Sequence, residues 1–251
     1  MENIISYSLY GGGNIYHHGA IRNAQTIKYF FPEFVARFYV GDSIPSELCE
    51  SLKSLSAEVI RIHGPETSRA MLWRFLPAQE NINIFLSRDC DCRFSEREVV
   101  AVREWMASKK TFHIMRDHPY HGVPILGGLW GCKGNSLAPW IRKIFDYKIN
   151  DANHGIDQDF LADIIYPHVK KDSYIHDSFF MFELITHKFS IKRQDNHFVG
   201  EAFNENDISN NLNAIQALIE TENSYFSKFI LKKNSAVAIL KSHVKDILSI
   251  K

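Results

Sequence analysis

Apolar and amphipathic stretches alternate along the first half of the chain. The apolar runs have the length of buried strands and cover residues 4–9, 34–40, 58–62, 82–86 and 111–115. Helical patterns lie between them over residues 20–31, 46–55, 68–76 and 95–108, and the last begins with a capping box of Ser95 and Glu98. Strands that alternate with helices at such short spacing indicate a mostly parallel α/β sheet.

The second half of the chain is less regular. Residues 117–134 are rich in Gly, His and Pro and predict a loop with a short strand. The remaining expected elements are helices over 139–145 and 158–165, short aromatic elements over 173–198, and helical stretches over 212–222 and 236–250. Because a polar, turn-rich segment precedes the last two, we expect an α/β domain over residues 1–203 and a helical extension over 204–251.

Composition narrows the class of protein. The 251 residues are 45% hydrophobic and 23% charged, as in a globular protein with a sizeable core. The 29 basic and 29 acidic residues balance, which disfavours non-specific binding to nucleic acid. Four cysteines without a disulfide pattern favour a reduced compartment, and the first residues lack the features of a signal peptide. We therefore expect a cytoplasmic protein.

Two aspartates follow the fourth expected strand, in the sequence R-D-C-D-C. Side chains alternate along a strand, so Asp89 and Asp91 would point the same way, with Cα atoms ~6–7 Å apart. Close carboxylates repel each other, and a divalent cation removes that cost; hard oxygen ligands favour Mg²⁺ or Mn²⁺. The pair predicts a metal site at the carboxyl end of the strand, where α/β sheets bind ligands. The alternative is a pair of solvated turn residues.

A second acidic motif, Asp157-Gln158-Asp159, begins a predicted helix 66 residues after Asp91. With the D-x-D, it resembles the retaining glycogenin and lipopolysaccharide galactosyltransferase family, and also uncharacterised bacterial or viral glycosyltransferases of the GT-A fold. The resemblance covers roughly residues 4–200. The segment Gly127-Gly128-Leu129-Trp130-Gly131, called the glycine loop, sits where such enzymes place a glycine-containing loop near the donor. Two departures are the absence of an apolar residue before the D-x-D and of the family's Asn-x-Gly in this loop.

The resemblance implies a fold and an activity. The expected fold is a Rossmann-like GT-A sheet, mixed and mostly parallel, flanked by helices and followed by a helical C-terminal tail. The implied activity is the metal-dependent transfer of a sugar from a UDP- or GDP-sugar to a glycan or glycolipid acceptor. Two other classes remain open: a nucleotidyl- or phosphotransferase that uses the same acids, and a non-catalytic module that binds nucleotide-sugars.

The same resemblance implies a histidine as the third metal ligand, beside Asp89 and Asp91. Two histidines are candidates. His176 lies at the end of a plausible strand, where a ligand from the core is expected, whereas His197 in N-H-F-V-G better matches the family's H-F-x-G. We favour His176 and keep His197 as the alternative.

The resemblance also implies how the donor is bound. The end of the first strand would contact the base or ribose, and a helix arginine would contact the diphosphate. The loop after the fifth strand would contact sugar hydroxyls, and the glycine loop would lie near the donor. The expected donor-binding residues are Ser8, Leu9, Tyr10, Arg69, Asp117, His118 and Gly128. Each also has an ordinary structural interpretation, as strand end, surface arginine or satisfied loop residue.

Asp157 and Asp159 are the candidate catalytic acids. In an inverting enzyme one of them would deprotonate the acceptor hydroxyl. In a retaining enzyme they would orient the sugar or stabilise an oxocarbenium-like state. The alternative for both is favourable charge at a helix N-terminus.

The end of the chain is basic. Six lysines and one acid, Asp246, lie between Lys228 and Lys251, so this stretch carries about +5. Such a tail could rest on an anionic membrane surface. It could equally pack on the domain and leave its lysines in solvent.

Overall fold

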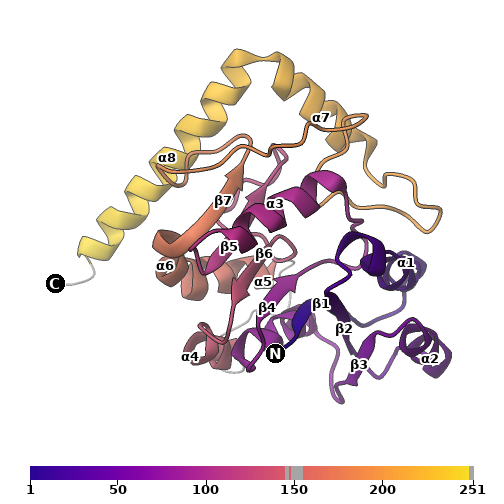
Figure 1. Cartoon of the computed structure of the whole chain (residues 1–251). Helices are drawn as coiled ribbons and strands as arrows, with labels where there is room; N and C mark the ends of the chain where they lie inside the picture. The colour runs from indigo at the N-terminus through magenta and orange to yellow at the C-terminus, as the bar shows by residue number, and fades with distance from the viewer. Residues whose placement is uncertain (145–146, 148–154, 249–251) are drawn as a thin grey trace.

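A seven-stranded sheet forms the centre of the computed structural model, which describes residues 1–144, 147 and 155–248 (Figure 1). Its order is β3-β2-β1-β4-β6-β5-β7. The strands are β1 (Asn3–Leu9), β2 (Phe34–Val40), β3 (Glu58–Arg61), β4 (Ile84–Ser87), β5 (Phe112–Arg116), β6 (Trp130–Lys133) and β7 (Ser173–Asp177). β6 pairs antiparallel with β4 and β5, and the other pairs are parallel. The predicted fold class, a mixed and mostly parallel α/β sheet, is therefore confirmed.

Helices cover both faces of this sheet. The longer ones are α1 (Asn14–Phe30), α2 (Ser46–Ser54), the 3₁₀ helix η1 (Ser68–Gln79), α3 (Glu96–Ala107), α7 (Leu212–Asn223) and α8 (Tyr225–Leu248). The short ones are α4 (Ala138–Ile141), η2 (Arg142–Ile144), α5 (Ile156–Phe160), η3 (Leu161–Ile165), α6 (Tyr166–Val169) and η4 (Lys170–Asp172). Among the described residues, no helix is long and apolar enough to cross a membrane.

β1 shows why apolar runs of the sequence form the central strands of the sheet. Ile5, Tyr7 and Leu9 pack on one face with α1, α2 and α3, while Ile4 packs on the other with η1 and α4–α6. Each of these four side chains is at most 1% exposed. Because successive side chains of a strand point to opposite faces, a strand covered by helices on both faces is mostly apolar, and the buried Ser6 of β1 is an exception.

Several boundaries differ from the sequence predictions. α1 begins at Asn14 rather than near residue 20, and α8 begins at Tyr225 rather than near residue 236. β4 ends at Ser87, so Asp89 and Asp91 lie in a turn after the strand, where the amide of Cys92 donates to the carbonyl of Asp89 at 3.3 Å. The expected ends of two helices, at 145 and 249–250, lie outside the described residues.

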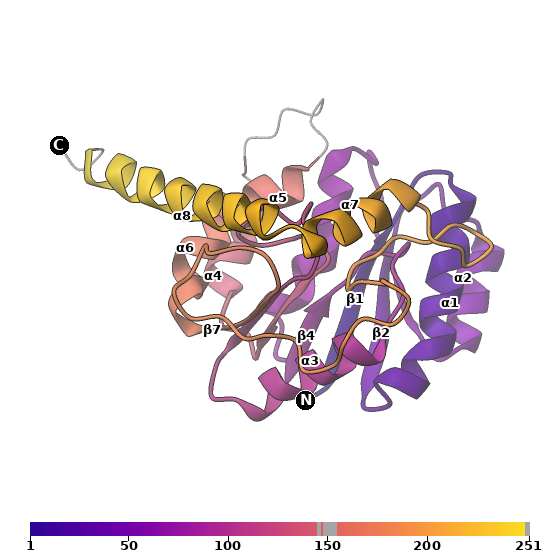
Figure 2. The same ribbon diagram turned by 90° about the horizontal axis from the view of Figure 1, so that it is seen from above.

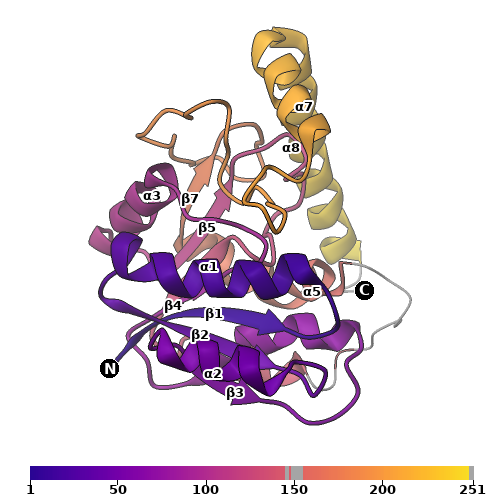
Figure 3. The same ribbon diagram turned by 90° about the vertical axis from the view of Figure 1, so that its right-hand side faces the viewer.

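The C-terminal helices α7 and α8 lie at the end of the molecule away from α2 and β3 (Figure 3). They meet the rest of the chain through a small apolar cluster of Phe179, Phe180, Phe182 and Leu218. The predicted helical tail is thus present. Its separation as a unit beginning at residue 204 stays a prediction.

Candidate functional site

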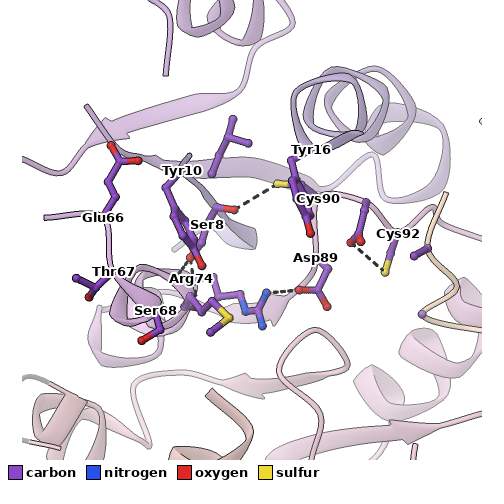
Figure 4. A pocket seen from close by; sticks show the side chains of 15 residues that line it. Ser8, Tyr10, Tyr16, Glu66, Thr67, Ser68, Arg74, Asp89, Cys90 and Cys92 are labelled. Atoms are coloured by element: carbon purple, nitrogen blue, oxygen red, sulfur yellow. Dashed lines mark hydrogen bonds and ion pairs between the residues drawn. The ribbon is translucent and has the colours of Figure 1, made fainter. Parts of the chain in front are cut away.

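A cavity of about 560 Å³ opens at the carboxyl ends of β1 and β4. Three segments form most of its wall, as Figure 4 shows: residues 8–10 at the end of β1, 66–68 before and at the start of η1, and 89–92 after β4. Gly200 and Ala202, from the segment between β7 and α7, complete it. β1 and β4 are parallel neighbours, so their carboxyl ends meet at one edge of the sheet. We call this cavity the cleft.

The end of β1 supplies an aromatic wall. Tyr10 packs edge-on against Trp73, with ring centroids 5.8 Å apart, and burial raises the pKa of its hydroxyl to about 12. Tyr16 also lines the cleft and is 49% exposed. Ser8 lines it too, but its hydroxyl accepts from the amide of Arg74 at 2.9 Å, so it holds η1 against the sheet. Leu9 lines the cleft and is 1% exposed.

The acidic pair faces this cleft. Burial, followed by the neighbouring charge of Asp89, raises the pKa of Asp91 from 3.8 to about 6. Burial also raises the pKa of the Cys90 and Cys92 thiols, which keeps them protonated and makes them poor metal ligands. The donor set is therefore two carboxylates, which suits Mg²⁺ or Mn²⁺, since Mg²⁺ is usually held by one or two carboxylates together with substrate phosphates.

Arg74 joins the two acidic motifs, and the sequence analysis missed it. Its guanidinium pairs with Asp89 through Nη1 and with Asp157 through Nη2, the latter at 2.5 Å (Figure 4 draws the pair with Asp89). The side chains of Arg74 and Asp157 are only 7% and 6% exposed. We call Asp89, Arg74 and Asp157 the ion bridge. It brings together residues that are 83 positions apart in the chain.

A smaller hollow of about 260 Å³ adjoins the cleft and shares Met71, Arg74, Asp89 and Gly200 with it. The glycine loop forms part of its wall. A Cβ on Gly127 would overlap the Asp157 carboxylate, and one on Gly128 would overlap that of Asp89. These two glycines are therefore required for the ion bridge to lie against the loop.

His121 and Gln158 line the smaller hollow and were not predicted as site residues. The backbone amide of Asp117 donates to Nδ1 of His121 at 3.0 Å, which leaves Nε2 as the protonated nitrogen of the ring. Burial, then the nearby His118, lowers the pKa of His121 to about 3. His121 is thus a neutral hydrogen-bond donor at the wall of the hollow.

Asp157 lines this hollow, whereas Asp159 does not. Asp159 is exposed on α5, although its neighbour Asp157 is 4% exposed. Alternate residues at the start of a helix point about 200° apart, so the two aspartates diverge. The structure thus separates the two candidate catalytic acids.

Three of the predicted donor-binding residues lie elsewhere. Arg69 donates to the carbonyl of Tyr147 at 3.0 Å and lines neither hollow. Asp117 is fully buried and accepts from Arg97 at 2.7 and 2.8 Å. His118 is 1% exposed and bonds through Nε2 to the carbonyl of Ala214 at 2.8 Å. These groups hold loops together, so we leave them out of the site.

His176 is also placed away from the acidic pair. It is fully buried on β7, and its Nε2 lies 2.8 Å from Glu104 while its Nδ1 lies 2.9 Å from Nε2 of His113. The alternative, His197, is on the segment that closes the cleft, three residues before Gly200. Its side chain is 47% exposed and bonds to Glu201 at 2.7 Å.

The segment with His197 is attached to the acidic turn, because the amide of Phe203 donates to the carbonyl of Asp91 at 2.8 Å. Even so, in the part of the chain that the structure describes, no three His, Cys, Asp or Glu side chains are positioned to hold a metal together. The arrangement therefore offers two carboxylates, with a histidine nearby on a connected segment.

No protein-family model and no curated protein matches the sequence. Among solved structures, a cytidylyltransferase from Leptospira borgpetersenii is similar at 14% identity and a TM-score of 0.43, over 70% of this chain and 75% of that one. The 4-diphosphocytidyl-2C-methyl-D-erythritol synthase of Anaerococcus prevotii is similar at 9% identity and a TM-score of 0.44. The match covers 89% of this chain and 99% of that one. Core-mannan synthase A of Aspergillus fumigatus, in an Mn/GDP form, is similar at 8% identity and a TM-score of 0.42. The match covers 80% of this chain and 81% of that one. The similarity is distant and concerns the fold alone.

Proposed function

We propose that this chain is a metal-dependent glycosyltransferase that uses a nucleoside-diphosphate sugar, such as a UDP- or GDP-sugar. One observation carries the proposal: two adjoining hollows meet at the ion bridge, beside a pair of carboxylates. The cleft has the volume of a small-molecule site and an aromatic wall, which suits a nucleoside diphosphate. The smaller hollow is lined by hydrogen-bonding groups, which suits a sugar.

In this proposal Asp89 and Asp91 hold Mg²⁺ or Mn²⁺, and His197 replaces His176 as the candidate third ligand. When bound, such an ion offsets the negative charge that grows on the departing diphosphate. Arg74 supplies a second positive charge to the same place, since its guanidinium already lies against Asp89. Tyr10 offers its ring to the base or the ribose.

The smaller hollow would orient the donor sugar. Asp157 accepts hydrogen bonds from sugar hydroxyls and is held in place by its ion pair with Arg74. His121 donates from Nε2, and Gln158 donates or accepts through its amide. A sugar fixed between these three groups presents its anomeric carbon to an acceptor, a glycan or a glycolipid, from the open side of the hollow.

The products formed with Mn²⁺ test this proposal. With a panel of nucleotide-sugars we expect slow hydrolysis of one donor to a nucleoside diphosphate and free sugar. Asp91→Asn should abolish it, while Lys53→Gln, on an exposed face of α2, should not change it. Release of pyrophosphate from a nucleoside triphosphate would instead identify a nucleotidyltransferase. Binding of nucleotide-sugars without any turnover, even with added acceptors, would leave only a binding module.

The raised pKa of Asp91 predicts a dependence of stability on pH. Between about pH 4 and pH 6 the carboxyl group of Asp91 is protonated in the folded chain and largely ionised in the unfolded chain. The stability of the metal-free wild type therefore falls as pH rises through that window and stays reduced above it. Asp91→Asn removes this cost and should be more stable by ~1–3 kcal/mol near pH 7.

Urea unfolding of wild type and Asp91→Asn, in a chelator, measures this difference. The gain should be present near pH 7 and nearly gone near pH 4, because Asp91 is then protonated in the folded chain and about half protonated in the unfolded chain. A variant that is less stable than the wild type at pH 7, or a gap that is equal at both pH values, would contradict this electrostatic account of Asp91.

A further inference from the structure

The outward face of α8 is largely apolar and carries one exposed lysine, Lys233. Leu231 and Ile239 on its inner face pack against the Phe179–Phe182 cluster, and Ser235 between them is 4% exposed. On the opposite side, four apolar side chains fall within an arc of about 80° at the helical spacing. They are Phe226, Phe229, Val237 and Leu240, which are 71%, 51%, 38% and 64% exposed. We call these four residues the outer face of α8.

The C-terminal part of the helix extends beyond the domain. In Figure 2, α8 continues past the sheet toward the C-terminus, and Figure 1 shows it as the edge of the molecule. A neighbouring loop adds further exposed apolar side chains: Leu184 is 97% and Ile185 is 78% exposed. This loop is tied to the helix, because the amide of Met181 donates to Oγ of Ser235 at 2.8 Å.

The positive charge of α8 distinguishes between two possible partners of its outer face, a second copy of the helix and an anionic surface. Between residues 225 and 241 the helix carries four lysines, at 228, 232, 233 and 241, and no acid. Two copies of such a helix would bring eight positive charges together, which opposes self-association. An anionic surface instead attracts the lysines while the apolar side chains enter the region below its headgroups.

We propose that α8 binds the surface of an anionic lipid bilayer, with its outer face inserted and its lysines among the headgroups. The helix then lies in the plane of the membrane, and the rest of the domain stays in water. This inference rests on α8 itself, and it does not depend on the proposed sugar transfer.

Flotation of the full chain with lipid vesicles tests the proposal. We expect binding to vesicles of phosphatidylcholine with phosphatidylglycerol, and at least ~10-fold weaker binding to phosphatidylcholine alone. The triple variant Phe226→Ser, Phe229→Ser, Leu240→Ser should lose ~10-fold or more of the binding to anionic vesicles. Its melting temperature should match the wild type, because the three side chains are exposed.

A matched control is Tyr29→Ser on α1, an aromatic side chain that is 78% exposed and far from α8 in the chain. It should bind as the wild type does. Equal binding by the triple variant, or no binding of the wild type to either vesicle, would overturn the proposal. So would a dimer in solution that only the triple variant disperses, because a second copy would then occupy the outer face.

Discussion

Replacing Arg74 by methionine is expected to lower the free energy of unfolding by about 3–5 kcal/mol. The substitution keeps most of the volume of the side chain but leaves the carboxyl group of Asp157, which is 6% exposed, without its cation. It also leaves Asp89 beside Asp91 with no positive neighbour from η1. Loss of one partner of a buried pair costs more than loss of both, since the remaining charge stays desolvated. Urea unfolding measures the effect.

The double variant Arg74→Met, Asp157→Asn is the control for this interpretation. Because the uncompensated carboxylate is then gone, much of the lost stability should return, and the two substitutions should be strongly non-additive. Additive losses, or a loss below about 1 kcal/mol for Arg74→Met alone, would contradict the ion bridge as a buried electrostatic unit.

Gly128→Ala is expected to weaken metal-dependent binding of a nucleoside diphosphate by about 10–100-fold. The new methyl group would overlap the carboxylate of Asp89 and lie 3.2 Å from its backbone nitrogen. Asp89 therefore has to turn or the loop has to move, and either change separates the carboxylate from Asp91. Titration of the nucleotide in the presence of Mn²⁺ gives the dissociation constant for variant and wild type.

Gly122→Ala is the matched control, because it lies in the same connection between β5 and β6. A Cβ there would meet the ring of Phe180 at an ordinary distance of 3.7 Å. This variant should bind the nucleotide as the wild type does. If both alanine variants bound normally, the close approach of the glycine loop to Asp89 would have no part in binding.

The layout of the first half of the fold could be predicted from the sequence. β2 has the expected bounds of 34–40, and α2 ends one residue before the expected end. β2 is a short apolar run followed by Gly41, and α2 follows Pro45 and has apolar positions at helical spacing. The start of α1 was missed because Gly12 and Gly13 precede it and no capping side chain marks its first turn.

The site could be predicted only where its residues are neighbours in the sequence. Asp89 and Asp157 could be proposed because each belongs to a short motif, and both border the smaller hollow. Arg74 and His121 were missed, since their partners are contacts of the folded chain rather than neighbours along it. The environment of Asp117 could not be predicted for the same reason. Its carboxylate pairs with Arg97 and Arg193, which are distant in the sequence, and no local pattern reveals these contacts.

The central claim is that Asp89 and Asp91 bind a divalent cation together with a nucleoside diphosphate in the cleft. Calorimetric titration of UDP, GDP and CDP, with Mn²⁺ and with a chelator, tests it most directly. We expect one nucleotide to bind at least ~10-fold more tightly with Mn²⁺ than without it, and Asp91→Asn to remove that difference. Equal affinities with and without the ion, or a metal effect that survives in Asp91→Asn, would contradict the claim.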